Sequence, residues 1–273
     1  MPYSIVMTRW LFAAALHASV AFLAQQPETM SLLEKPLFAP PLSKDERSAR
    51  EDALAAARTA YDGDRANVDA TLALARAQMA LGRVGDSLET LTRGVESKPD
   101  DARIRLERGR GLIVIRKFEV ATRDLEKSAE TLPAGSCALG MARYLAADYP
   151  RARAAFAKCP DPGVFAYLAD WRTGPSAMPR PVVSREPTPD PPAPSRLPGA
   201  ATKPGPTTRV PMTAAYLDAA ERLIKGDTAG AKELLKQIVE KDRNQWMDPV
   251  YIAAEADYAR VLQAEPKKRK KKL

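Results

Sequence analysis

Few residues in this 273-residue chain have the side chains that enzymes use most often for chemistry at neutral pH. It has one histidine, His17, and two cysteines, Cys137 and Cys159. Histidine is the commonest general acid or base and a frequent metal ligand. Catalysis would otherwise depend on lysine, tyrosine or paired carboxylates, and no pattern of these residues indicates a site. We therefore predict no catalytic residue, no cofactor and no metal site, and no small-molecule substrate is evident.

The N-terminal stretch that contains His17 has the features of a secretory signal peptide. Arg9 precedes an apolar run from Trp10 to Ala24, which is shorter than the roughly 20 residues needed to span a bilayer. Ser19-Val20-Ala21 is the best cleavage site, so we predict residues 1–21 as the signal. The mature protein would then contain no histidine and would lie in the periplasm or cell envelope. If the segment is instead an uncleaved anchor or an amphipathic start, the protein is cytoplasmic.

Positive charge is concentrated at the other end of the chain, in the basic tail 266–273. The formal net charge is +8, and it falls to +2 without six cations of this tail. These are Lys267, Lys268, Arg269, Lys270, Lys271 and Lys272. Such a run is typical of nuclear import, nucleic-acid binding or contact with an anionic membrane, and a solvated tail without a partner is the alternative. A signal peptide disfavours nuclear import, and no aromatic residue between the cations supports base stacking.

The elements between these ends are organised by a pattern that occurs twice, 34 residues apart. With Val68 and Ala102 as equivalent first positions, small residues recur at positions 8 and 20, and apolar residues recur at positions 17 and 24. The matching pairs are Ala75 and Gly109, Ser87 and Ala121, Val84 and Phe118, and Leu91 and Leu125, and Pro99 and Pro133 close the two units. A fixed period of this length is the signature of a helix–turn–helix solenoid.

This pattern resembles the tetratricopeptide repeat family. A third unit starts at Pro133 and fits positions 7, 8, 17, 20 and 24 with Leu139, Gly140, Tyr149, Ala152 and Phe156. Ala53 and Ala60 fit the second helix of a degenerate opening unit, for which Ser43 and Glu46 form a capping box. The resemblance implies an all-α solenoid over residues 43–172 with roughly three to four repeats.

Composition separates three further segments. Residues 22–42 contain four prolines and predict an extended lead-in. Residues 173–211 contain twelve of the 24 prolines, which predicts a disordered or polyproline linker; a docking site for a proline-recognising partner is the alternative. Helical pattern resumes over 212–265, where Ala219, Gly226, Ala231 and Leu235 fit a degenerate repeat. This small C-terminal helical unit either packs back on the stack or pairs with another chain.

The resemblance also implies a binding surface, because in this family positions 2, 5, 9 and 12 of each first helix face the concave side. By matching position these are Asp69, Leu72, Arg76 and Met79, then Arg103, Leu106, Arg110 and Ile113, then Ala134, Cys137, Met141 and Tyr144. From them we predict a peptide-binding groove made of Arg76, Met79, Arg103, Leu106, Arg110, Met141 and Tyr144. Its arginines would suit an acidic or C-terminal peptide; an ordinary solvated helix face is the alternative. Arg105 and Arg108 depart from the pattern, since the family fills their positions with buried apolar residues.

Matched to the family, Cys137 and Cys159 occupy positions 5 and 27 of the third unit, on helices that run antiparallel. In an oxidising compartment the resemblance implies a disulfide between them; two small unbonded thiols are the alternative. The function that the sequence favours is a non-catalytic scaffold or adaptor that binds a protein or peptide in the concave groove. The rival is a nucleic-acid- or anionic-surface-associated protein that acts through the tail.

Overall fold

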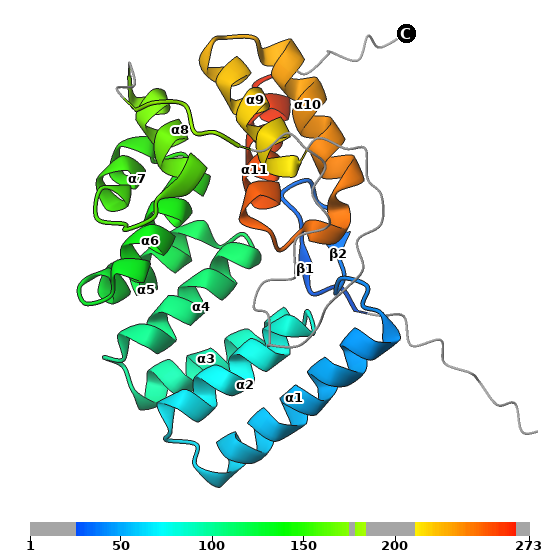
Figure 1. The fold of residues 1–273 in the computed structure, drawn as a ribbon, viewed down its shortest axis with the longest axis vertical. Helices are drawn as coiled ribbons and strands as arrows, with labels where there is room; N and C mark the ends of the chain where they lie inside the picture. Colours follow the sequence, from blue (N-terminus) through cyan, green and yellow to red (C-terminus); the bar gives the residue numbers. More distant parts are fainter. Residues whose placement is uncertain (1–25, 175–177, 184–210, 266–273) are drawn as a thin grey trace, which may run out of the picture.

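The structure is a computed structural model that describes residues 26–174, 178–183 and 211–265; the predicted signal peptide, most of the proline-rich linker and the basic tail lie outside these ranges. Within them the chain is almost entirely helical (Figure 1), which confirms the all-α prediction. The elements are β1 (Thr29–Met30), β2 (Pro36–Leu37), α1 (Lys44–Gly63), α2 (Val68–Ala80), α3 (Val84–Ser97), α4 (Ala102–Val114), α5 (Phe118–Ala129), α6 (Pro133–Leu145), α7 (Tyr149–Phe156), α8 (Gly163–Thr173), α9 (Met212–Ile224), α10 (Thr228–Lys241), the 3-10 turn η1 (Arg243–Gln245) and α11 (Pro249–Ala264).

Short polar residues fix where several helices begin. Ser43 forms the predicted capping box: its Oγ accepts from the Glu46 N–H, and the Glu46 carboxylate accepts from the Ser43 N–H. The side chains of Asn67 and Asp101 cap α2 and α4 by accepting hydrogen bonds from backbone N–H groups of the first turn. Such caps satisfy donors that have no partner inside the helix.

Four helix pairs share one geometry. Their first helices, α2, α4, α6 and α9, each contain 13 residues, and the second helix of each pair starts at position 17. Position 15, in the turn between the two helices, has a positive φ in every pair: Gly82 75°, Arg116 64°, Ala147 63° and Gly226 82°. The pair α9–α10, which the sequence marks as degenerate, therefore has the same backbone turn as the three units before it.

Small residues at position 8 allow the two helices of a unit to touch. A Cβ added to Gly109 would lie 2.5 Å from Cδ2 of Leu125, and one added to Gly140 would lie 2.6 Å from Cδ1 of Phe156. In the first unit the Ser87 hydroxyl donates to the Ala75 carbonyl at 2.8 Å. The larger apolar residue at position 24 thus fills the space that the small residue leaves, as the sequence pattern predicts.

Arg105 and Arg108 face the core side of α4, where the family pattern has apolar residues. Both donate to the buried carboxylate of Asp124 on α5: Arg105 at 2.9 Å, and Arg108 at 2.6 and 2.8 Å. The shared carboxylate of Asp124 compensates the partial burial of both guanidinium groups, and the aliphatic stem of an arginine can take the place of an apolar side chain. The helix therefore keeps the repeat geometry without apolar residues at these positions.

The C-terminal helices fold back onto the stack (Figure 1). Of the two placements that the sequence leaves open, the structure shows this one: α9 packs on α8, and α11 packs on α6. Leu145 and Leu168 of the stack belong to the same apolar core as Tyr216, Leu217 and Ile252 of the C-terminal unit. The second and third repeats and the C-terminal unit therefore share one core, whereas most apolar residues of α1, α2 and α3 form two separate clusters.

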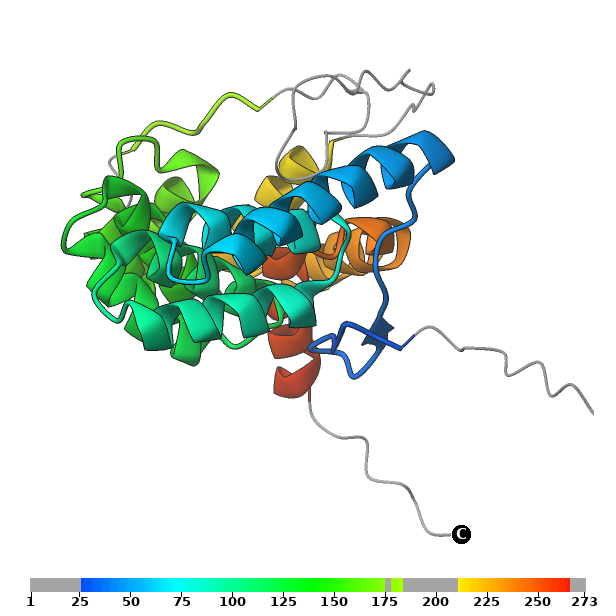
Figure 2. The same ribbon diagram turned by 90° about the horizontal axis from the view of Figure 1, so that it is seen from below.

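Residues 26–42 link the C-terminal unit to the first repeat. Within the segment expected to be an extended lead-in, β1 and β2 instead pair antiparallel, with Thr29 opposite Leu37. Figures 1 and 2 both show this hairpin beside α11. The Trp246 indole N–H donates to the Phe38 carbonyl at 2.7 Å, and the Val84 N–H at the start of α3 donates to the Glu28 carboxylate at 3.0 Å.

Candidate functional site: an apolar groove on the concave face

The concave side of the first three repeats contains an open groove of about 730 Å³. One side is formed by α2, α3, α4 and α6, and the facing wall by Met247 and the start of α11. The lining residues are Ala75, Arg76, Met79, Ser87, Leu91, Glu107, Arg110, Gly111, Ile113, Val114, Cys137, Ala138, Met141, Met247, Pro249 and Ile252. Most of them are apolar, and the size lies in the range of protein ligand sites.

Four residues of the predicted groove line it: Arg76, Met79, Arg110 and Met141. They share the concave face because positions 9 and 12 of each first helix lie about one turn apart on the same side. Gly111 lies at the floor, where an added Cβ would approach Cδ2 of Leu88 to 2.8 Å. Glycine at this place allows α4 to pack closely against Leu88 of α3.

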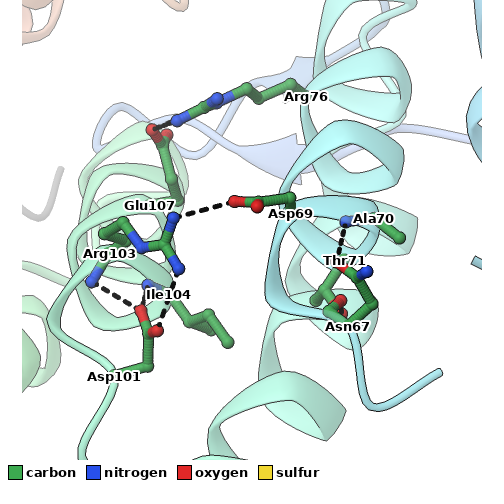
Figure 3. A network of polar contacts seen from close by, with 9 residues as sticks. All are labelled: Asn67, Asp69, Ala70, Thr71, Arg76, Asp101, Arg103, Ile104 and Glu107. Atoms are coloured by element: carbon green, nitrogen blue, oxygen red, sulfur yellow. Dashed lines mark hydrogen bonds and ion pairs between the residues drawn. The ribbon is translucent and has the colours of Figure 1, made fainter. Parts of the chain in front are cut away.

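The two arginines at the rim share one carboxylate, that of Glu107; Figure 3 shows its pair with Arg76. Arg76 donates to Glu107 through Nη2 at 2.8 Å and Nε at 3.3 Å. Arg110 reaches the same Glu107 oxygen only at 3.5 Å, and its side chain is 49% exposed. These three side chains sum to one positive charge, and Arg110 is the less tightly held of the two cations.

Arg103 and Leu106 do not line the groove. Arg103 lies at the start of α4, where it donates to Asp69 at 2.8 Å and to Asp101 at 3.4 Å (Figure 3). Hydrogen bonding to Asp101 raises its pKa further above the usual range. Leu106 is buried in the core between α4 and its neighbours. The expectation that all three arginines present free forks to a ligand is therefore corrected, because Asp69, Asp101 and Glu107 are their partners.

Tyr144 is also outside the groove, since it is only 1% exposed. The C-terminal unit covers it: its hydroxyl lies 2.8 Å from the hydroxyl of Tyr216 on α9, which in turn donates to Asp257 on α11 at 3.0 Å. Asp257 also accepts from Arg172 at 2.6 Å. Burial raises the pKa of both tyrosines above the usual range. The C-terminal unit thus covers the end of α6 at Tyr144, whereas Met141 on the same helix still lines the groove.

A second buried polar cluster holds α11 at the groove. Arg116, in the turn between α4 and α5, donates to Glu255 at 2.6 and 2.9 Å and to the Trp246 carbonyl at 3.0 Å. The other Glu255 oxygen accepts from the Leu32 N–H of the hairpin at 2.7 Å. Glu255 is completely buried, so one carboxylate joins the second repeat, the hairpin and α11.

Sequence reasoning missed the wall formed by Met247, Pro249 and Ile252, and it missed the Arg116–Glu255 pair. Both depend on contacts between residues more than a hundred positions apart. The available signal was Glu255 itself, a charged residue within an apolar helix pattern. Buried charges need partners, so this residue indicated a long-range ion pair without identifying it.

The two cysteines lie next to the groove and are bonded. Cys137 on α6 forms a disulfide with Cys159, which follows α7, and their Cα atoms are 4.8 Å apart. The bond joins the start of the first helix of the third repeat to the end of the second. Because Cys137 also lines the groove, the disulfide fixes part of its floor.

Within the ranges 26–174, 178–183 and 211–265, no group of three or more His, Cys, Asp or Glu side chains is arranged to hold a metal ion. In the same part of the chain no helix has the length and apolar character needed to cross a membrane. The predicted signal peptide and the six cations of the basic tail fall outside these ranges.

Comparison with known proteins supports the repeat pattern. Residues 46–107 match the family model described as tetratricopeptide repeat, which covers α1, α2, α3 and the first part of α4. The resemblance read from the sequence is confirmed over these residues, which match the tetratricopeptide repeat family. Searches of the curated proteins and of the solved structures found no match. Repeats of this family generally mediate protein–protein interaction.

Proposed function

We propose that this protein is a non-catalytic scaffold or adaptor that binds a partner protein in the concave groove. The observation that supports this most directly is the open, mainly apolar groove lined by Met79, Met141 and Met247. Solvent-facing apolar surfaces of this kind mark interaction sites. Methionine side chains are flexible and polarizable, so they adapt to the shape of a bound side chain.

The proposal includes export to the periplasm or cell envelope. The bond between Cys137 and Cys159 supports it, because disulfides persist in oxidising compartments and are rare in the cytosol. Intact mass of the unreduced protein from its native cell tests both points together: loss of residues 1–21 and of two hydrogens is expected. A full-length, reduced mass would place the protein in the cytoplasm. The basic tail would then take first place as a contact for nucleic acid; in the exported protein we propose an anionic surface as its target.

The groove is tested by site-specific photo-cross-linking in the native cell. A photoreactive residue is placed at Met79 or Met141, and the control is Val120 on α5, which is 46% exposed and does not line the groove. The same partner protein should be captured from both groove positions and not from Val120. Capture of that protein from all three positions, or from none, would contradict the proposal.

A further inference from the structure

The groove has an unusual construction, since its two sides come from distant parts of the chain. Met79, Arg110 and Met141 belong to the repeats, whereas Met247, Pro249 and Ile252 belong to the segment around the start of α11. The second wall is present only while α11 is docked. The buried pair Arg116–Glu255, the contact between Tyr144 and Tyr216 and a shared apolar core join the C-terminal unit to the repeats.

The same concave surface already accepts helices of this chain. One repeat beyond the groove, α9 places Tyr216 against Tyr144, and α11 packs against α6. The groove continues this surface toward α2 and is open along one side. Because this surface already packs against two helices of the chain, we take a helix as the occupant of the groove beside them.

The lining sets the chemistry of that helix. Three methionines from three separate elements offer an adaptable apolar surface, which suits aliphatic residues at the i, i+3, i+4 and i+7 positions of an amphipathic helix. At the rim, Arg110 is half exposed and reaches Glu107 only at 3.5 Å. Arg76 and Arg110 together exceed Glu107 by one positive charge, so a carboxylate beside the apolar stripe completes the charge balance.

We propose that the groove is a composite site that takes one amphipathic helix of a partner protein, with an aliphatic stripe against the three methionines and a carboxylate at Arg110. The site is complete only when α11 is docked. Occupancy and docking are therefore coupled: the partner helix binds the docked form and holds the C-terminal unit in place. This inference rests on the proposed function and adds the partner's chemistry and the role of the C-terminal unit.

The test uses the purified full chain and three 18-residue peptides of designed sequence. One has leucines in a single stripe flanked by glutamates, the second has lysines in place of the glutamates, and the third has the first composition with the stripe dispersed. We expect the first peptide to bind about 10-fold or more tightly than either of the others in fluorescence anisotropy. Arg110→Ala should abolish the preference for glutamate over lysine.

Groove variants locate the peptide. Met141→Glu should abolish binding, and Val120→Glu, which adds the same charge to an exposed site outside the groove, should leave it unchanged. Met247→Ala should weaken binding by about 10-fold. In hydrogen exchange, the bound peptide should slow amide exchange in α11 as well as in α4.

The outcomes separate this inference from the proposed function. Equal binding of all three peptides would overturn the helix and its charge. Binding that is insensitive to Met247→Ala and leaves exchange in α11 unchanged would overturn the composite site. Displacement of the first peptide by a fatty acid or by a second copy of the chain would overturn the partner helix as the occupant. In each case, capture of one protein from both Met79 and Met141 would still support a partner-binding groove.

Discussion

The repeats have an open half, which lines the groove, and a covered half, which lies against α9 and α11. Position 12 of the first helix is Met79 in the first repeat and Tyr144 in the third. Met79 lines the open groove, whereas Tyr144 is buried beneath α9. Equivalent repeat positions thus give a groove-lining residue in one unit and a core residue in another, because α9 covers Tyr144 and leaves Met79 uncovered.

The two halves also treat charge differently. In the open half, Arg76 and Arg110 share Glu107 near solvent, where an ion pair contributes little and can be exchanged for another. In the covered half, Arg116 and Glu255 are withdrawn from water, so removing either partner leaves an uncompensated charge. An exposed ion pair such as Arg76–Glu107 can be exchanged for a pair with a bound partner. The buried pair Arg116–Glu255 is suited to a contact within the fold.

The largest expected effect comes from the covered half. Glu255→Ala leaves Arg116 and the Leu32 N–H buried without their partner, so we expect a loss of about 3–5 kcal/mol in the free energy of unfolding. Denaturant titration measures this. Arg93→Ala, which removes an exposed i,i+4 pair with Glu89, should change it by less than about 0.5 kcal/mol.

The same variant tests docking directly. With a protease site inserted within residues 184–210, the two fragments of the parent chain should remain associated on gel filtration after cleavage. The fragments of Glu255→Ala should separate. Fragments of the variant that remain together would show that the C-terminal unit is held by the apolar core and not by this ion pair.

The next effect concerns the floor of the open half. Reduction of the bond between Cys137 and Cys159 frees a loop with a sequence separation of 22 residues, which the chain-entropy model associates with about 3 kcal/mol. The double variant Cys137→Ser, Cys159→Ser should show the same loss in thermal unfolding. Because neither cysteine touches α9 or α11 through a polar bond, the cleaved fragments should still associate.

A smaller loss of stability is expected when the hydroxyl of Tyr216 is removed. Tyr216→Phe removes the hydrogen bonds of its hydroxyl with Tyr144 and Asp257 and should cost about 1–3 kcal/mol at neutral pH, since Asp257 is charged. Because burial raises the pKa of both tyrosines, their contribution to the free energy of unfolding is complete below pH 10, the ordinary pKa of tyrosine. As pH rises above this value the unfolded state loses protons that the folded state keeps, so stability falls. Denaturant titrations across pH 9–11 should show a shallower fall for Tyr216→Phe.

The sequence predicted the stack well because its signals are local. The 34-residue spacing and the small residues at Gly109 and Gly140 describe contacts within one helix pair. The predicted groove residues are correct where the C-terminal unit does not cover the repeats: Arg76, Met79, Arg110 and Met141 line the groove. Tyr144 was misplaced since what covers it is Tyr216, 72 residues away, and position within a repeat carries no information on such a contact.

The smallest prediction compares the same turn in the two halves. Arg116 and Ala147 both occupy position 15 with positive φ, a conformation that costs an L-residue about 1–2 kcal/mol and glycine nothing. Ala147 forms no side-chain hydrogen bond, so Ala147→Gly should stabilise the protein by about 0.5–1 kcal/mol after the entropy of glycine is included.

Arg116→Gly relieves the same backbone but removes the partner of Glu255, and it should destabilise the protein by several-fold more than Ala147→Gly stabilises it. Thermal unfolding of both variants under one condition gives the comparison. If both substitutions stabilise, the turn dominates and the ion pair contributes little. Changes in stability of opposite sign would show that the ion pair between Arg116 and Glu255 outweighs the strain of the positive φ at Arg116.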